Sequence, residues 1–529
     1  MTTKLGIAIV MALCAAPVAK AQPAATSPQP SAAQQTQMLT LADATARALQ
    51  RNLDVRIERE VVAEADARAL GALGSYDLRL RADASERHHR DPITTLFSGA
   101  PPGQVSPSNT DFASSLSVSK LFKNGATATG SATVARDMTD SFFTLFAPAY
   151  ITSLGVQVRQ PLLRGRGTDA ARTQLTVTSL GRERSNATLR QRIQNTVASV
   201  EQAYWSLVAT RREVEVRRDA ITLAEQQRAD TQSRIDARTA AALDIAQPTA
   251  EVERRRGDYF AAEEQSARAE RTLKLLMTDD PADPLWSQTL VPSNPPDIES
   301  RPIDIQKALT DAMTLRPELA ALAADVSVAT AQTALAKDAL KPQVDIVGSY
   351  TARGLAGTHN PDTLAFPGVI SPFPEVLAGG LGVSYDALFR QRLPDASIGV
   401  SVDVPLGRRA AKGDYAVAQA QQRQSTLVLA SQRDRIAVDV LDSATALQTA
   451  ISRVQSARAG LDAANTQLRA EQERFTAGTS TNFLVLTRQN DLEQAQLTEI
   501  SALTEYRRAL TEFARAKGTL LTDRGITVR

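Results

Sequence analysis

The sequence predicts a mainly α-helical protein with membrane β-structure: a transmembrane β-barrel shared between protomers, continued by a long α-helical coiled-coil barrel, in an internally duplicated chain. Three observations lead to this fold class. Apolar residues recur every seven positions over long stretches, elsewhere their period changes to two, and both patterns occur twice along the 529 residues. A period of seven keeps one helix stripe facing a partner helix, whereas a period of two gives a strand one apolar and one polar face.

The duplication is visible as matched positions in the two halves. Ala44, Ala48, Leu49, Asp54 and Val55 recur 264 residues later as Ala308, Ala312, Met313, Glu318 and Leu319. Further on the offset is 240: Val200, Leu207, Val214, Ile221, Arg228 and Ile235 correspond to Val440, Leu447, Val454, Leu461, Leu468 and Phe475. Two gapless seven-residue ladders are hard to obtain by chance. We expect the change of offset to belong to the loops between them.

The ladders predict two long helical hairpins. No proline interrupts the chain from about Ala410 to Phe475, which gives a helix of about 100 Å at 1.5 Å per residue. The chain then turns at 476–480 and returns as a helix over about 481–521. In the first half the turn is 236–240 and the returning helix covers about 241–277, where Pro248 should bend it. An ordinary coiled-coil rod gives the same pattern, so the hairpins alone define no function.

Four segments alternate as strands. Thr152–Arg159 and Ser397–Val404 alternate strictly, and Asp77–Ser85 and Gln343–Tyr350 do so more weakly. Transmembrane strands of about 9–11 residues show this pattern, but so does the half-buried strand of a soluble sheet. The long connecting loops, 87–110 and 353–374, favour the membrane interpretation because outer-membrane barrels carry long loops on the outside.

A fifth and sixth segment, 112–122 and 126–136, flank the turn Lys123-Asn124-Gly125, and Asn-Gly is a strong hairpin signal. The sequence does not say whether this hairpin enters the barrel wall. Four strands cannot close a barrel, and open sheet edges are not tolerated in lipid. Strands that span the membrane must therefore be pooled by several chains.

Composition excludes several classes of protein. The formal net charge is +2, and removal of a 21-residue leader that contains Lys4 and Lys20 leaves zero, so no basic field exists for nucleic acid. The single cysteine, Cys14, lies in that leader, and the three histidines are not spaced as metal ligands. We therefore predict no catalytic residues, no cofactor-binding residues, no metal site and no enzymatic activity.

The N-terminus has the features of a secretory signal: Lys4, an apolar stretch over 5–16, and the small-x-small site Ala19-Lys20-Ala21. No later segment offers 18 uncharged apolar residues, so no membrane helix is expected. The predicted organisation is a signal peptide (1–21), a disordered leader (22–38), a first repeat (39–279), a Pro-rich connector (280–302), a second repeat (303–522) and a short tail (523–529).

At this point the chain resembles the TolC-type outer-membrane efflux protein family. The segment 474–486, which begins Arg-Phe-Thr-Ala-Gly-Thr-Ser, is similar to the family's hairpin-tip signature. Gln160-Pro161-Leu162-Leu163-Arg164-Gly165 and Val404-Pro405-Leu406-Gly407 resemble its strand-to-helix junctions, and Ala203–Leu207 is also typical. The resemblance implies a homotrimer with a 12-stranded barrel in outer-membrane lipid and a helical tunnel that extends into the periplasm.

The resemblance also implies partners and a function. An inner-membrane pump would supply the energy, and a periplasmic adaptor protein would contact the hairpin tips. This chain would be the passive export duct of a tripartite efflux or type I secretion assembly. A periplasmic coiled-coil adaptor or a structural protein is the alternative. The exported substrate and the pump class are not readable from the sequence.

Two sets of site residues follow from the resemblance. The adaptor-contacting tips are Asp236, Ala237, Arg238, Thr239 and Ala240 in the first half, and Ala477, Gly478, Thr479, Ser480 and Thr481 in the second. The first tip departs from the pattern, because Arg238 stands where the second has Gly478. The pore constriction is assigned to Asp244, Phe483, Leu484 and Thr487, with three Asp244 carboxylates as an acidic ring. Alternatively, Asp244 is an acid in the first turn of a helix, where the helix dipole favours it.

Overall fold

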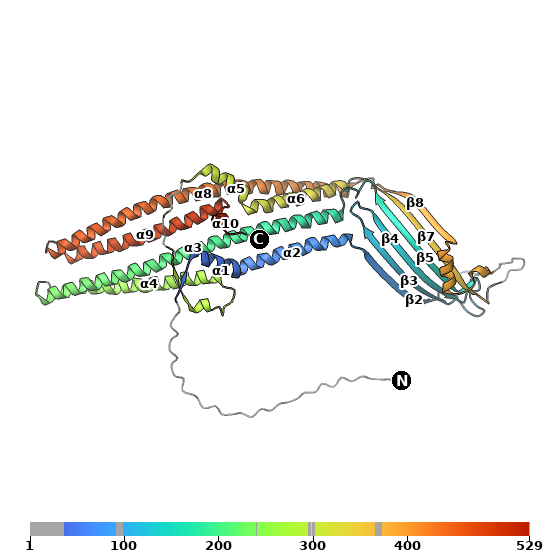
Figure 1. The fold of residues 1–529 in the computed structure, drawn as a ribbon, viewed down its shortest axis with the longest axis horizontal. Coiled ribbons are helices and arrows are strands. Elements are labelled where there is room, and N and C mark those ends of the chain that lie inside the picture. Colours follow the sequence, from blue (N-terminus) through green and yellow to red (C-terminus); the bar gives the residue numbers. More distant parts are fainter. Residues whose placement is uncertain are drawn as a thin grey trace, which may run out of the picture.

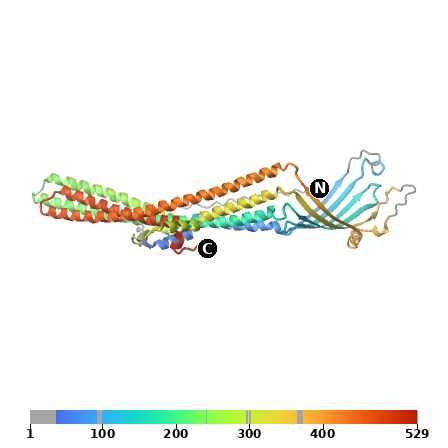
Figure 2. The same cartoon turned by 90° about the horizontal axis from the view of Figure 1, so that it is seen from above.

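The computed structural model describes residues 36–90, 99–239, 241–294, 298, 302–364 and 373–527. The predicted signal peptide, residues 22–35 of the predicted leader and the tip residue Ala240 lie outside the described residues. The molecule is an elongated rod with a β-sheet at one end and the turns of two helical hairpins at the other (Figure 1). The view from above shows the same division (Figure 2). The predicted fold class is confirmed.

Each half of the chain contributes one long hairpin. In the first half α3 (Ala170–Asp236) runs to the tip and α4 (Ala246–Met277) returns; in the second half α8 (Arg409–Thr476) and α9 (Asn482–Ala516) do the same. Seven of the twelve predicted ladder positions are buried, with Val200, Leu207, Val440 and Val454 fully buried. The other five, most of them near the tip end of the first hairpin, are partly buried. Strict seven-residue spacing keeps these side chains on the face that packs against the returning helix.

Nearer the sheet, four helices lie side by side. They are α2 (Leu53–Leu73), α3, α6 (Pro317–Asp338) and α8, and the contacts run in that order. Among the described residues α6 alone combines the length and mean hydropathy of a membrane-crossing helix, and it packs between α3 and α8. This order makes α2 and α8 the two outer helices of the layer.

The sheet contains six antiparallel strands in the order β2-β3-β4-β5-β7-β8. Their bounds are β2 Arg79–His89, β3 Asn109–Leu121, β4 Thr127–Thr139, β5 Phe146–Pro161, β7 Gln343–His359 and β8 Leu393–Asp403. The four strands expected from alternation are therefore confirmed. The hairpin around Lys123-Asn124-Gly125 joins the same sheet as β3 and β4.

The two faces of the sheet differ in polarity. On β8 one face carries Ile398, Val400 and Val402, all well exposed in the single chain, and the other carries Ser397 and Ser401. The register continues both faces across the sheet: Val400 lies opposite Ile346, which is exposed as well. An apolar face that is exposed over strands of 11 to 17 residues fits a lipid surface.

A short helix covers the outer end of this apolar face. Helix α7 (Leu381–Phe389) packs on β5 and β7 through Ser384, whose hydroxyl lies 2.9 Å from that of Thr152. Gly354 permits the approach, because a Cβ there would lie 1.9 Å from the Ser384 carbonyl oxygen. Tyr385 and Phe389, stacked with ring centroids 6.4 Å apart, are exposed beside it.

Short elements form a girdle around the middle of the rod (Figure 1). They are α1 (Leu41–Arg51), α5 (Ile305–Leu315), α10 (Leu520–Asp523) and a parallel pair, β1 (Thr36–Leu39) with β6 (Thr289–Pro292). Tyr204 of α3, fully buried, donates a hydrogen bond to the carbonyl oxygen of Leu39. Burial raises the pKa of this phenol. The girdle thus connects the start of the first repeat to the connector.

The structure corrects several expected boundaries. Residues 36–38 were expected to be disordered, but they belong to β1, which pairs with a strand in the connector. The first returning helix begins at Ala246 after the 3₁₀ helix η2 (Ala242–Ile245), so Pro248 lies in its first turn, where its missing N–H costs little. The second returning helix ends at Ala516, because Gly518 adopts a left-handed conformation before α10.

Candidate functional site

The two hairpin tips are closed by the same backbone geometry. At the first tip Thr239 N–H donates to the Arg234 carbonyl at 2.9 Å, and at the second Thr479 N–H donates to the Arg474 carbonyl at 2.9 Å. Gly478 has φ 76° and its counterpart Arg238 has φ 60°. The first tip therefore turns without glycine by placing an arginine in the left-handed region. This conformation costs about 1–2 kcal/mol for a residue with a Cβ.

The tips also contact each other. The Arg234 guanidinium of the first tip lies 3.8 Å from the centroid of the Phe475 ring of the second, and it donates a hydrogen bond to the Phe475 carbonyl at 3.2 Å. Slightly farther from the turns, the Gln227 amide donates to the side chain of Asn482. The two halves of the chain are thus joined directly at this end of the rod.

The predicted constriction residues lie just after the two turns. Asp244 is exposed in η2, and its carboxylate accepts a hydrogen bond from the Ala241 N–H at 3.0 Å. Phe483 and Leu484 are exposed in the first turn of α9, and the Thr487 hydroxyl donates to the Phe483 carbonyl at 2.8 Å. Asp244 therefore caps a helical turn in the single chain, and its role as one member of an acidic ring stays a prediction.

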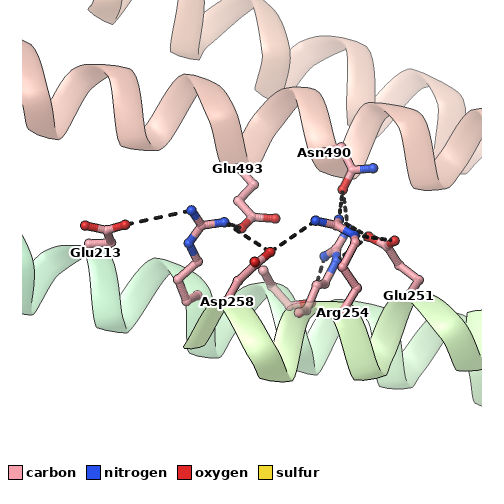
Figure 3. Close-up of polar contacts among 9 residues, drawn as sticks. Glu213, Glu251, Arg254, Asp258, Asn490 and Glu493 are labelled. Atoms are coloured by element: carbon pink, nitrogen blue, oxygen red, sulfur yellow. Dashed lines mark hydrogen bonds and ion pairs between the residues drawn. The ribbon is translucent and has the colours of Figure 1, made fainter. Parts of the chain in front are cut away.

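A polar network that the sequence analysis missed joins the two hairpins behind the tips (Figure 3). Arg217 of α3 bonds to Glu493 of α9, with Nη1 2.5 Å from Oε1. Arg217 also lies 3.7 Å from Asp258 of α4 and 3.8 Å from Glu213 of α3. Since Glu493 belongs to the second hairpin, this ion pair bridges the halves of the chain.

Arg255 forms the second part of the network. Its side chain is 1% exposed, and its guanidinium donates to the Glu251 carboxylate at 2.8 Å, the Ala220 carbonyl at 2.8 Å and the Asn490 amide oxygen at 2.9 Å. Arg254 reaches the same Asn490 oxygen at 3.2 Å. A fully buried cation is retained only when its donors are satisfied, and here they tie α4 to both α3 and α9.

The charges of the network are nearly balanced. Three guanidiniums, of Arg217, Arg254 and Arg255, face four carboxylates. These carboxylates belong to Glu213, Glu251, Asp258 and Glu493. Burial alone would raise the pKa of Glu251, but hydrogen bonds from the two neighbouring arginines outweigh burial and hold that pKa below its usual value. The Glu251 carboxylate is therefore ionised near neutral pH.

Only part of this network carries a sequence signal. The run Glu251-Val-Glu-Arg-Arg-Arg256 has charges at helical i,i+3 and i,i+4 spacing, which predicts pairs along one exposed helix face. Arg256 follows that expectation and pairs with Glu253 and Glu225 within its own hairpin. No local pattern distinguishes the buried Arg255 from it.

The arrangement links the two hairpins through side-chain contacts. Among the described residues, no group of three or more His, Cys, Asp or Glu side chains is arranged to hold a metal ion. Any movement that separates the hairpin α3–α4 from α9 must break the bond between Arg217 and Glu493 and the bonds to Asn490. The network therefore resists separation of the two hairpins at this level of the rod.

Comparisons with known proteins agree with this architecture. Residues 308–519 match the family model described as outer membrane efflux protein. No curated protein matches the sequence. Three similar solved structures are a membrane protein from Pseudomonas aeruginosa (19% identity, TM-score 0.62, 90% of this chain and 93% of that one), the Campylobacter jejuni CmeC outer membrane channel (14%, 0.64, 91% and 86%) and the Vibrio cholerae outer membrane protein VceC (14%, 0.62, 90% and 96%). At these identities the likeness establishes the fold.

A sheet with one exposed apolar face, joined to paired helical hairpins longer than a membrane is thick, defines a subunit of an outer-membrane channel. Residues 308–519, most of the second repeat, are similar to the outer membrane efflux protein family. This match and the channel fold together indicate that the protein lies in the outer membrane and extends into the periplasm, with efflux as its class of function.

Proposed function

We propose that three copies of this chain form a passive duct that carries substrate across the outer membrane from a periplasmic adaptor and an inner-membrane pump. The sheets close into a barrel in the lipid, and the hairpins continue it as a tunnel through the periplasm. The pump supplies the energy, and the duct removes the need for a second energy-using step.

The observation that carries this proposal is the pair of unpaired sheet edges. Strands β2 and β8 each pair on one side only among the described residues, although the apolar face of the sheet is exposed. Unpaired backbone groups cost several kcal/mol each in hydrocarbon, so a single copy is unstable in the membrane. Copies of the same chain supply the missing partners.

The helices next to these edges support assembly as well. Leu53, Ile57 and Leu70 are exposed on α2, and Val417 and Leu427 are exposed on α8. Because α2 and α8 are the outer helices of the layer, a neighbouring copy would cover these apolar side chains together with the strand edges.

The adaptor would meet the tips, which are the ends of the hairpins farthest from the sheet. The residues proposed for this contact are those predicted from sequence, at 236–240 and 477–481. The proposed constriction is formed by Asp244, Phe483, Leu484 and Thr487. No chemical step is assigned to the protein, which acts as a conduit and not as an enzyme. A periplasmic adaptor or a coiled-coil rod would leave the membrane sheet without a role.

The test combines location, assembly and transport. The protein should fractionate with the outer membrane, migrate as a trimer in detergent until heated, and restore export in a host that lacks its own duct. Recovery only from the soluble periplasm, or as a monomer from the outer membrane, would remove the proposal. A fractionated trimer that does not export would remove the assignment as a duct but keep the assembly.

A further inference from the structure

The sheet has six strands, two more than the number of helices in the layer below it. The four helices of the layer each continue directly into or out of one strand: α2 into β2, β5 into α3, α6 into β7 and β8 into α8. Strands β3 and β4 have no helix below them. The hairpin β3–β4 is therefore inserted in the middle of a four-strand plan, between β2 and β5.

The widths of the two layers explain what the insertion does. Strands lie about 4.8 Å apart, and a tilt of about 40° spreads each over about 6 Å of a barrel's circumference. Six strands then cover about 38 Å, and four would cover about 25 Å. Four packed helices at about 9 Å each cover about 36 Å. Six strands match the helical layer, whereas four would force the duct to narrow at the membrane.

We propose that the β3–β4 hairpin gives this protein an 18-stranded barrel, three copies of six strands, whose bore is about as wide as that of its helical tunnel. This closure rests on the proposed assembly of three copies. The expected circumference is about 113 Å, or about 36 Å in diameter between backbones, against about 24 Å for 12 strands. The membrane part of the duct would then be no narrower than the tunnel below it.

The side chains of the hairpin are those of a barrel wall. On one face the register places Ser115, Ser117 and Ser119 opposite Thr133, Ser131 and Thr129. On the other face it places Leu116 opposite Ala132 and Val118 opposite Gly130. The first face continues into the polar face of β5 and the second into Leu154 and Val156. The hairpin thus extends both the lumen wall and the lipid surface, with small hydroxyl side chains on the lumen side.

Closure also requires that the edges meet in a compatible direction. Neighbouring strands in the sheet are antiparallel throughout, so β2 and β8, which begin and end a row of six, run in opposite directions. The β8 strand of one copy then meets the β2 strand of the next as an antiparallel pair. The same pairing repeats at all three junctions.

The first experiment places the hairpin. The only cysteine of the chain, Cys14, lies in the predicted leader, so single cysteines introduced elsewhere can be labelled selectively. Ser117→Cys should react in intact cells with a charged maleimide that does not cross membranes. The matched control Leu116→Cys, one residue away on the other face, should be protected by lipid. Equal reactivity of the two would overturn the placement of β3 in the barrel wall.

The second experiment measures the bore. Ser349→Cys on the polar face of β7 is labelled from outside with maleimides that carry polyethylene glycol chains of increasing length. The comparison is a variant that lacks 109–139, in which β2 can pair with β5 directly. The apolar faces of these two strands stay aligned, because Leu80 and Val156 lie on the same face of the sheet. The register connects them by way of Val118 and Gly130. The full chain should accept chains at least twice the mass that the deletion accepts. The same cut-off in both would refute the 18-stranded barrel.

A third measurement covers the case in which the deletion fails to assemble. Ser85→Cys on β2 is combined in turn with Ser397→Cys and Ser401→Cys on β8, all on the polar face. Oxidation of the full chain should give covalent dimers and trimers for at least one pair. Absence of cross-links in a trimer that still exports would refute this edge pairing while the proposed duct stands. Absence of a trimer would instead remove the proposed function.

Discussion

The ion pair between Arg217 and Glu493 should control how easily the tip end opens, and its two members should contribute unequally. Replacing Arg217 with Met leaves the Glu493 carboxylate, 8% exposed, without its cation. Breaking a buried pair in this way costs about 3–5 kcal/mol. Because Arg217 itself is 21% exposed, we expect the lower end, about 3 kcal/mol per chain, which corresponds to about a hundredfold in an equilibrium.

Glu493→Gln should cost much less. The amide keeps the volume and one acceptor oxygen, and Arg217 retains Asp258 and Glu213 within 4 Å. Loss of one carboxylate also leaves three guanidiniums facing three carboxylates, whereas loss of Arg217 leaves two facing four. We expect about 1 kcal/mol, the value of an ordinary hydrogen bond, or about a fivefold shift.

The assay is single-channel recording in planar bilayers, which measures the fraction of time spent conducting. The control is Arg256→Met, because the ion pairs of Arg256 with Glu225 and Glu253 lie within the first hairpin and are half exposed. Exposed pairs contribute at most about 1 kcal/mol, so the control should resemble the parent. If Arg217→Met conducts no more than this control, the link does not hold the tip end closed. If Glu493→Gln opens the channel as much as Arg217→Met, the charge count is wrong.

Four further outcomes are expected. Gly478→Trp at the second tip should leave the trimer intact and abolish export; unchanged export would count against an adaptor contact there. Asp244→Ala should reduce cation selectivity and block by trivalent metal ions in bilayers, and no change would leave the apolar side chains of the constriction as the barrier. The pKa of Glu251 is held below its usual value, so the ionised carboxylate stabilises the folded link fully above about pH 4.3. This stabilisation is lost as the pH falls through the lowered pKa. Conductance should therefore stay constant from pH 7 to 5 and rise below about pH 4. Gly354→Val should displace α7. A cysteine in place of the buried Ser384 should then react with a reagent added from outside in the double variant Gly354→Val/Ser384→Cys, but not in Ser384→Cys alone. A cysteine that stays protected in the double variant would show that α7 tolerates the added side chain.

Periodicity predicted those helices and strands in which apolar residues recur at a regular spacing along the sequence. The seven-residue ladders identified both hairpins, because each apolar stripe packs along its own returning helix. Alternation identified the strands, and the Asn-Gly turn identified the inserted hairpin. The four-residue strand β1 was missed since so short a segment shows no period, and its partner β6 lies 253 positions away.

The network between the hairpins was beyond prediction for a different reason. Arg254, Arg255 and Arg256 are identical residues in sequence, and their environments differ through distant partners. Arg255 reaches the Ala220 carbonyl of α3 and Asn490 of α9, whereas Arg256 reaches Glu225 of α3. The tips illustrate the same limit. An arginine at position 238 suggested that the first tip differs in shape, but its backbone adopts the conformation of Gly478 because the same two hydrogen bonds close both turns.

The two halves of the chain differ most in the number of strands that each contributes to the sheet. The offset between equivalent positions is 264 from Arg79 at the start of β2 to Gln343 at the start of β7, and 244 from Pro161 to Pro405 after the last strands. The first half thus gains 20 residues between these points, where it holds β3 and β4 and the second half holds α7. The change of offset was expected to belong to loops, and instead it spans an added hairpin.

A hairpin is the smallest addition that the sheet accepts. One extra strand would reverse the direction of an edge, so that β8 would meet the next β2 in parallel. Two strands preserve antiparallel closure and the alternation of faces. Helices in the tunnel have no equivalent freedom, because each packs against neighbours on both sides along a seven-residue register. Widening the membrane part by two strands, while four helices remain, is therefore the change that duplication followed by insertion permits.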